Sequence, residues 1–417
     1  MRVASYLRIW SVVMPILWSG GAAAAPPPIP ELALWEAQMI QYGQQNCNRL
    51  NDPSIAGDKK LADTYYDGER VFYLMYEYTK NSAWLTCAQR AEQVYRDGYV
   101  IGNNGGVPGY WNFPHGIWFD YKRTSDATSR NALFLLATKA AYSNSPIAWT
   151  ADANGTDGGS REVAYNLMAQ LLAMDSAGFT DQARINALVG QAFDHMDQWF
   201  VRKTATYVRP FMASLTSEAL IMWHKKTGDA RVLPIVRTAM DWIWDNMWLT
   251  ADQCFKYTDR STSTGGMEPA PDLNLLVAPV FAWLYVQTGD AKYQIRGDAI
   301  FAGGVRKGTQ YLALGKQFNQ NYRWSFDYVY WRSQQNSPMY ALLPGSTTTT
   351  AGISSGSSSA TFSPSTSTTS SGQTSTTTTS TTTTPAATVS TATTLTTDSS
   401  SPSNSRNVRH QHGPLRK

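Results

Sequence analysis

The stretch MWHKKTGDARVLPIVRTAMDWIW (Met222–Trp244) contains the end of one helix, a tight turn and the start of the next helix. Gly228 suits the left-handed conformation in which helices commonly end. Asp229 can accept hydrogen bonds from the first N–H groups of the following helix. Apolar residues then recur at helical spacing. This stretch therefore predicts a helical hairpin with a very short turn.

The same plan recurs along the chain. YEYTKNSAWLTCAQRAEQVY (Tyr76–Tyr95) and YVQTGDAKYQIRGDAIFAGG (Tyr285–Gly304) share it closely, and AMDSAGFTDQARINALVGQAF (Ala173–Phe193) is a looser copy. Gly289 and Asp290 repeat the roles of glycine and aspartate at the turn. The connections at the other end of the hairpins are long: Ile101–Thr124, Val201–Arg209, Thr250–Pro271 and Leu312–Arg323.

Helical periodicity covers most of the segment from Pro30 to Leu343, and no alternating strand of any length is evident. The predicted helices are Glu31–Arg49, Leu61–Thr79, Ala83–Val100, Ser125–Tyr142, Ser160–Ser176, Thr180–Phe200, Pro210–Thr227, Ala230–Trp248, Asp272–Thr288, Ala291–Tyr311 and Trp324–Arg332. One hairpin is irregular, because SNSPIAWTADANGTDGG (Ser143–Gly159) does not look helical where an outer helix is expected.

This series of antiparallel hairpins resembles the six-hairpin (α/α) toroid superfamily, which includes many glycoside hydrolases and several polysaccharide lyases. The resemblance covers about Pro30 to Leu343 and rests on the hairpin repeat. It implies an all-α fold in which five to six hairpins close into a ring. A stacked solenoid is the structural alternative.

Both ends of the chain differ in composition from its middle. Residues 1–25 predict a signal peptide, because the basic residues Arg2 and Arg8 precede a short apolar run, Ile9–Trp18, that leads to small residues near Ala25. Residues 26–344 form the predicted catalytic domain. Residues 345–417 are rich in Ser and Thr and predict a disordered tail. We expect a secreted or periplasmic protein without membrane attachment after signal cleavage.

Charge and cysteine content limit the possible classes further. The net charge is +4, but the signal peptide and the tail contribute the positive excess, so the domain itself is close to neutral. This composition does not favour a nucleic-acid partner. Three cysteines are present, and a Cys47–Cys87 disulfide would leave Cys254 free. No spacing of Cys and His indicates a zinc site, and no cofactor is expected.

The first turns of the apolar helices, and the long loops before them, should meet at one end of such a ring. Polar residues gather there, and loops at one end of a scaffold commonly carry function. The candidate catalytic residues are Asp67, His115, Asp120, Glu218, Asp272 and Tyr322. Asp126, Asp157 and Asp272 also suit helix N-caps, which would explain them without catalysis. Asp63 suits the N-cap role better than Asp67 does.

Aromatic residues are unusually frequent, with 15 Trp and 22 Tyr in the chain. The segment GYWNFPHGIWFDYKRTSD (Gly109–Asp126) is interpreted as a connection whose rings form one wall of a sugar cleft. Flat rings pack on the apolar faces of sugars, while polar side chains bind the hydroxyl groups. The candidate substrate-binding residues are Tyr66, Trp111, Asn112, Trp118, Arg123, Arg209, Arg323 and Trp324.

Two mechanisms fit these residues. A glycoside hydrolase needs two carboxyl groups that flank the glycosidic bond, and the recurring carboxylates favour this interpretation. A polysaccharide lyase instead needs a Tyr or His for proton transfer and an Arg or Asn to neutralise a uronate carboxylate. A non-catalytic glycan-binding scaffold is the third possibility. We expect a monomer with a carbohydrate partner. The sequence contains no phosphate loop, nucleophile elbow or HExxH motif.

Overall fold

The computed structural model describes residues 27–145, 150–151, 159–177, 179–262, 265–308 and 310–341. The chain divides into two units, Met1–Thr347 and Thr348–Lys417, and all described residues belong to the first. The predicted signal peptide, the predicted tail and Asp157 lie outside the described residues.

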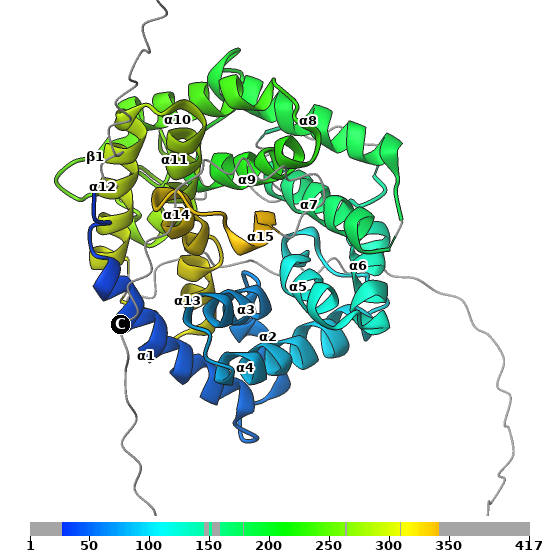
Figure 1. Cartoon of the computed structure of the whole chain (residues 1–417). Coiled ribbons are helices and arrows are strands. Elements are labelled where there is room, and N and C mark those ends of the chain that lie inside the picture. Colours follow the sequence, from blue (N-terminus) through cyan, green and yellow to red (C-terminus); the bar gives the residue numbers. More distant parts are fainter. Residues whose placement is uncertain are drawn as a thin grey trace, which may run out of the picture. The chain divides into compact units, whose positions relative to one another are not determined.

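The described part of the chain is almost entirely helical, as predicted (Figure 1). The α-helices are α1 (Leu32–Asn51), α2 (Gly57–Asp63), α3 (Gly68–Thr79), α4 (Ala83–Glu92), α5 (His115–Thr124), α6 (Ala127–Lys139), α7 (Gly159–Ala177), α8 (Gln182–Phe200), α9 (Pro210–Thr227), α10 (Val232–Met247), α11 (Asn274–Thr288), α12 (Ala291–Lys307), α13 (Gly315–Tyr322), α14 (Ser325–Arg332) and α15 (Pro338–Ala341). A π-helix, η1 (Gln93–Ile101), continues α4, and η2 (Gly109–Trp111) and η3 (Pro271–Leu273) are short 3₁₀ turns. Two short strands, β1 (Trp248–Leu249) and β2 (Cys254–Phe255), pair antiparallel.

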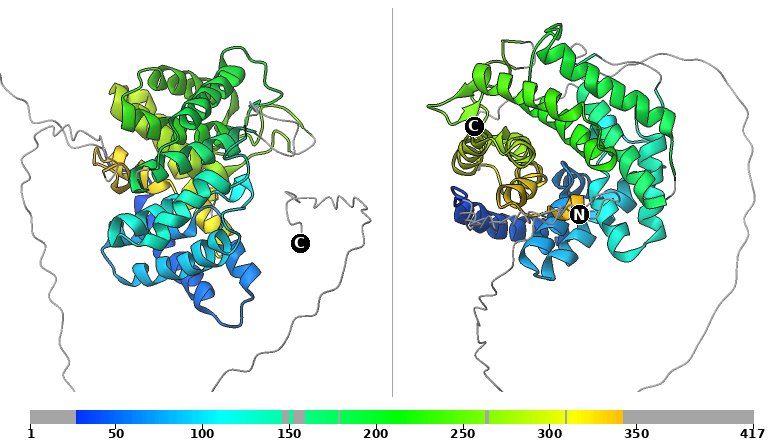
Figure 2. Two further views of the ribbon diagram at one scale, coloured as in Figure 1. Left: turned by 90° about the vertical axis from the view of Figure 1, so that its right-hand side faces the viewer. Right: turned by 45° about the horizontal axis from the view of Figure 1, so that its top comes forward.

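The helices form an inner and an outer layer (Figure 1, Figure 2). In the inner layer, successive contacts join α3 to α5, α5 to α7, α7 to α9, α9 to α11 and α11 to α14, while α13 contacts α3. Helices α1, α4, α6, α8, α10 and α12 pack outside them. Every residue of Pro210–Met222 in α9 and of Asn274–Leu284 in α11 is buried. Outer helices such as α10 bury only one stripe, as amphipathic helices do.

The segment Gly109–Asp126, which the sequence predicts to be a connection, contains the inner helix α5. Ile117, Trp118 and Phe119 are buried in the core, so Trp118 and Phe119 do not line a cleft. The first six residues of α5 are all buried, so this part of the helix has no solvent-facing side, and the periodicity that identifies surface helices is missing there. Because α5 belongs to the inner layer, α6 packs outside it, and these two helices form a regular hairpin. No outer helix is therefore needed in Ser143–Gly159, where the sequence prediction expected one.

The hairpin turns agree with the sequence prediction. Gly228 and Gly289 have φ values of 73° and 68° at the ends of α9 and α11. Asp290 and Asp126 cap α12 and α6 through side-chain oxygens that accept backbone N–H groups. Asp229 accepts the N–H of Arg231, one residue before α10 begins.

The structure contains the predicted Cys47–Cys87 disulfide, which joins α1 to α4 across 40 residues of sequence. Cys254 is free and buried. Among the described residues, no helix has both the length and the apolar character needed to span a membrane.

Removal of the disulfide tests its contribution to stability. The double variant C47S/C87S should lose about 3 kcal/mol in the free energy of unfolding, because the bridge restricts the unfolded chain. Urea denaturation with and without a thiol reductant measures this loss. The reductant should destabilise the wild type to a similar extent and leave the double variant unchanged. An equal effect of reductant on both proteins would contradict the assignment.

Candidate active site

A chain of alternating charges lies at the centre of the inner layer. Arg323, just after α13, donates to Oε2 of Glu218 in α9 at 2.8 Å. Arg70 in α3 donates to Oε1 of Glu218 at 2.7 Å and to Oδ2 of Asp327 in α14 at 3.3 Å. The four side chains are at most 1% exposed. Two positive and two negative groups therefore neutralise each other inside the fold.

Glu218 is central to this chain, and it is not a free carboxylate. Both of its oxygens accept guanidinium N–H groups, and removal of one partner of a buried ion pair is strongly destabilising. Asp327 completes the chain on the other side. Burial raises the pKa of Asp327 to about 6, while the neighbouring Arg70 opposes this shift.

Asp67 caps two inner helices at once. Its carboxylate accepts the N–H of Arg70 at 3.1 Å in the first turn of α3, and the N–H groups of His115 and Gly116, both at 3.2 Å, at the start of α5. The prediction that Asp63 caps α3 is wrong, since Asp63 ends α2 and pairs with Arg49. Asp67 is therefore bound by backbone donors and is less available for catalysis than predicted.

Gly116 permits this close approach of α3 and α5. A Cβ atom at position 116 would lie 2.6 Å from the backbone nitrogen of Arg70 and 2.7 Å from Oδ1 of Asp67. Real Cβ atoms do not come so close to backbone atoms, so the two helix starts can share Asp67 only with glycine here.

His115 lies beside Asp67 with a neutral imidazole. Burial and the nearby charges of Arg70 and Arg323 lower the pKa of His115 well below its usual value. Nδ1 is 3.8 Å from Oδ2 of Asp67, which is too long for a hydrogen bond. Nε2 is buried and has no hydrogen-bond partner among the described residues.

Two tyrosines lie near the same centre. The buried hydroxyl of Tyr165 in α7 and Nε of Arg323 also have no hydrogen-bond partner in the described part of the chain. Tyr66 is 6% exposed and has a φ of 65°, which is rare for a bulky residue, and Asp67 follows with a φ of 66°. Burial raises the pKa of Tyr66 to about 12, while the charges of Arg161 and Arg323 oppose this shift. Consecutive left-handed residues break the predicted helix Leu61–Thr79 into α2 and α3.

Partly exposed residues surround this centre at the N-terminal ends of the inner helices. Asp272 is partly exposed, accepts from Gln320 at 3.2 Å, and has a pKa that burial raises above its usual value. Nζ of Lys316 lies 5.6 Å from the ring centre of Tyr65. Trp111 also contacts Tyr65, with ring centres 4.7 Å apart. We call the partly exposed residues Tyr65, Trp111, Arg161, Asp272 and Lys316 the rim.

Two arginines add positive charge beside aromatic rings. Arg161 lies 5.3 Å from the ring centre of Tyr110 and pairs with Glu162. The guanidinium carbon of Arg209 lies 4.6 Å from the ring centre of Tyr207 and 5.0 Å from that of Tyr257.

A small apolar depression is lined by Pro210, Phe211, Phe255, Lys256, Tyr257, Ala270, Leu273, Asn274 and Val277.

Several predicted site residues lie elsewhere. The Tyr322 hydroxyl donates to the backbone oxygen of Trp35 in the outer helix α1. Trp118 donates to Asp175, and Arg123 pairs with Glu77. Trp324 is wholly buried, and Asn112 is buried with its amide donating to Asn166. The structure therefore gives these five side chains packing or structural contacts.

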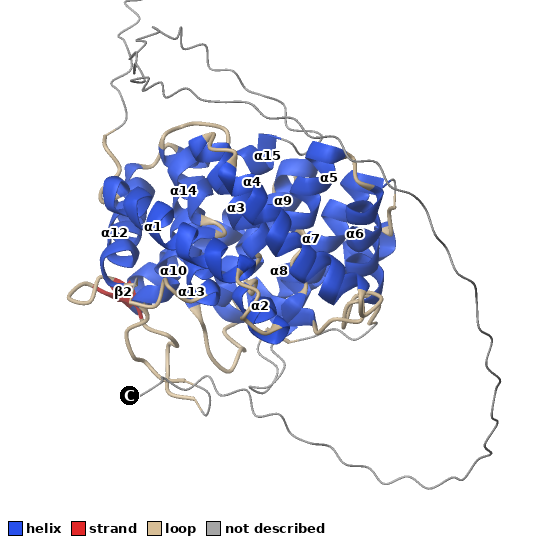
Figure 3. Ribbon diagram, turned by 90° about the horizontal axis from the view of Figure 1, so that it is seen from below, coloured by secondary structure: helices blue, strands red, loops and turns tan. Residues whose placement is uncertain are grey.

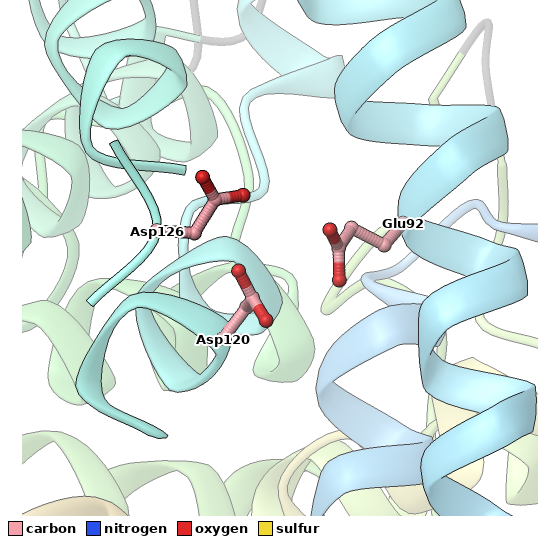
Figure 4. A group of neighbouring side chains, drawn as sticks. All are labelled: Glu92, Asp120 and Asp126. Atoms are coloured by element: carbon pink, nitrogen blue, oxygen red, sulfur yellow. The ribbon is translucent and has the colours of Figure 1, made fainter. Parts of the chain in front are cut away.

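Asp120 belongs to a separate acidic cluster. Carboxylates of Glu92, Asp120 and Asp126 point toward one another from α4, α5 and the start of α6 (Figure 4). Such a group could hold a metal ion, but the guanidinium of Arg96 in the π-helix η1 pairs with all three carboxylates. The cluster is a network of ion pairs in which Arg96 supplies the cation.

Arg70, Asp327 and Tyr165 are absent from the candidates that the sequence predicts, and so are Arg161 and Lys316 of the rim. Arg70 and Asp327 lie at helix starts where candidates are expected, but their partners are distant in sequence. Tyr165 lies one helical turn after Arg161 and so shares its helix face. This four-residue spacing from Arg161 is the feature from which Tyr165 could have been predicted.

Comparisons with known proteins found no matching family model, no matching curated protein and no matching solved structure.

The buried Glu69 gives a test of the electrostatics near this site. Its carboxyl oxygens have no hydrogen-bond partner among the described residues, and burial and the charges of Glu92, Asp67 and Asp120 raise its pKa well above 4.5. The folded protein therefore keeps a proton that the unfolded chain loses. Stability should fall by about 1.4 kcal/mol per pH unit as the pH rises above the unfolded pKa.

E69Q removes this titration. Urea denaturation between pH 5 and 8 measures the free energy of unfolding. As the pH rises, E69Q should become more stable relative to the wild type. E268Q, at an exposed position, is the control and should follow the wild type. A constant difference between E69Q and the wild type at all pH values would show that Glu69 is ionised in the fold.

Proposed function

We propose that the chain is a secreted glycan-cleaving enzyme built on a six-hairpin (α/α) toroid and active as a monomer. The contacts from α3 round the inner layer to α13, which returns to α3, support the toroid. Five inner helices each pack against the outer helix that follows in the chain: α3 with α4, α5 with α6, α7 with α8, α9 with α10 and α11 with α12. The Cys47–Cys87 disulfide and the expected signal peptide are consistent with export.

The observation that carries the proposal is the group of unengaged polar atoms near Arg323. The Tyr66 hydroxyl has no hydrogen bond among the described residues, and the Tyr165 hydroxyl and Nε2 of His115 are also unpaired there. Tyrosine and neutral histidine can donate and accept protons. Arg161 and Lys316 on the rim can bind a carboxylate.

This combination favours β-elimination at a uronate over hydrolysis. In that reaction a base removes the proton next to the sugar carboxylate, the glycosidic C–O bond breaks, and an acid protonates the leaving oxygen. We assign proton transfer to Tyr66 and His115. The arginine and lysine charges would stabilise the negative charge that develops on the carboxylate.

Hydrolysis is the second candidate, and Asp272 favours it. This carboxyl group lies on the rim, is partly exposed, and has a raised pKa, as a general acid requires. A second available carboxylate is also needed. Glu218 and Asp67 are engaged by two arginines and by three backbone N–H groups, so neither supplies it without rearrangement.

A panel of neutral and uronate-containing polysaccharides separates the candidates. New reducing ends with the ultraviolet absorbance of unsaturated uronates indicate elimination. Reducing ends without that absorbance indicate hydrolysis. Binding without any product indicates a glycan-binding scaffold and contradicts the proposal of an enzyme.

Variant Y66F tests the assigned chemistry on a substrate found in that panel. Loss of the hydroxyl should lower kcat by about 100-fold or more, which is typical for removal of a general acid or base. The matched control is Y322F. It removes a hydroxyl that donates to the backbone oxygen of Trp35 in the outer helix α1. Y322F should keep kcat within a few-fold of the wild type. If D272N abolishes cleavage while Y66F does not, hydrolysis replaces elimination as the mechanism.

A further inference from the structure

A short segment at the end of the described chain covers the central charges. Residues 337–340, which we call the strap, follow α14 after an exposed turn at Gln334–Asn336. The Ser337 hydroxyl donates to Oδ1 of Asp327. Met339 and Tyr340 are 1% and 4% exposed, so the strap is part of the core.

Tyr340 connects the strap to the chain of charges. Its ring lies 5.1 Å from that of Trp331 in α14. Burial and the charges of Asp327 and Glu218 raise its pKa well above the usual value, while Arg70 opposes the shift. The alternating series Arg323, Glu218, Arg70 and Asp327 therefore ends at the strap.

The strap lies at the end of the helical layers opposite to the rim. In Figure 1, α15 lies among the inner helices α3, α5, α7, α9 and α14. In Figure 3, α15 lies at one edge of the layers, while β2 and the long loops lie at the opposite edge. The rim residue Lys316 lies in the first turn of α13, which lies toward that loop edge in Figure 3, and η3, which contains Asp272, contacts α13.

We propose that residues 337–340 act as a stopper that seals the inner layer at this end, so that the central tyrosine, histidine and arginine residues are reached only from the rim. The four charged side chains of the central series are at most 1% exposed, so they are shielded from solvent on the strap side. Ser337 and Tyr340 contribute to this shielding through direct contact with Asp327 and Trp331.

The consequence for a ligand rests on the proposed function. With the strap end sealed, the end or a bend of a glycan would approach the central residues from the rim, and the polymer could not thread through the inner layer. Cleavage would then depend on what the rim can bind. The sealing itself does not depend on any activity.

Arginine-directed dicarbonyl labelling, followed by mass spectrometry, tests the stopper in the full chain. Arg70 is wholly buried beneath the strap and should label slowly in the wild type. Y340A should raise the labelling rate of Arg70 several-fold. S337A removes only the hydroxyl contact with Asp327 and should give a smaller rise in the same direction.

Three controls make the result decisive. Q335A, at an exposed position of the preceding turn, should leave Arg70 labelling unchanged. Arg161, on the rim, should label at the same rate in all variants. Arg96, buried in the separate acidic cluster, reports general loosening and should also be unchanged.

Unchanged labelling of Arg70 in folded Y340A and S337A overturns the stopper. A parallel rise at Arg96 also overturns it, because the strap would then support the whole core without a specific seal. If Y340A does not fold, S337A decides alone. The labelling needs no substrate, so a polysaccharide panel without product would refute the proposed function and leave this test in force.

Discussion

The Glu218 carboxylate, held between the guanidinium groups of Arg70 and Arg323, is the interaction on which the rest of the structure depends. The three residues come from α9, from α3 and from the end of α13. An isolated charge at this depth would be very costly, and a neutral series of ion pairs is the arrangement that makes burial tolerable. The geometry of the inner helices must therefore keep these groups in contact.

Arg323 links the structural ion pairs to the groups assigned to proton transfer. It pairs with Glu218, and its charge acts on the pKa values of Tyr66 and His115. A change in the structural ion pairs would therefore also affect the groups assigned to proton transfer. Asp67 adds a second link, since it joins the starts of α3 and α5 and places His115 beside them.

The sequence reveals those parts of the fold that depend on local chemistry. The turns at Gly228 and Gly289, the caps Asp126 and Asp290, and the disulfide all follow from residues close in sequence or from simple pairing. Helix α5 escapes sequence prediction because the burial of its first six residues removes the amphipathic pattern there. The break at Tyr66 and Asp67 escapes it because a bulky residue such as Tyr66 rarely adopts the left-handed conformation. The break is stabilised by contacts to α5 that only the fold provides.

The candidate site is harder to predict for a related reason. Glu218 and Asp120 are both carboxylates in apolar helices, and sequence alone does not show that arginines 148 and 24 residues away engage them. Long-range pairing decides whether a buried acid is structural or available for chemistry. Tyr66, His115 and Arg323 could be selected as candidates from the sequence, but the helix start at His115 and the unpaired atoms of these residues could not be predicted.

Hydrogen exchange measured by mass spectrometry, with and without a defined oligosaccharide of uronic acids, tests the location of the site most directly. The account predicts slower exchange in peptides that contain the helix starts around Tyr66, His115 and Arg161. It predicts unchanged exchange in the strap and in the outer helices α4 and α10. Protection at the strap or on the outer layer, without protection at the helix starts, would contradict the assignment of the site.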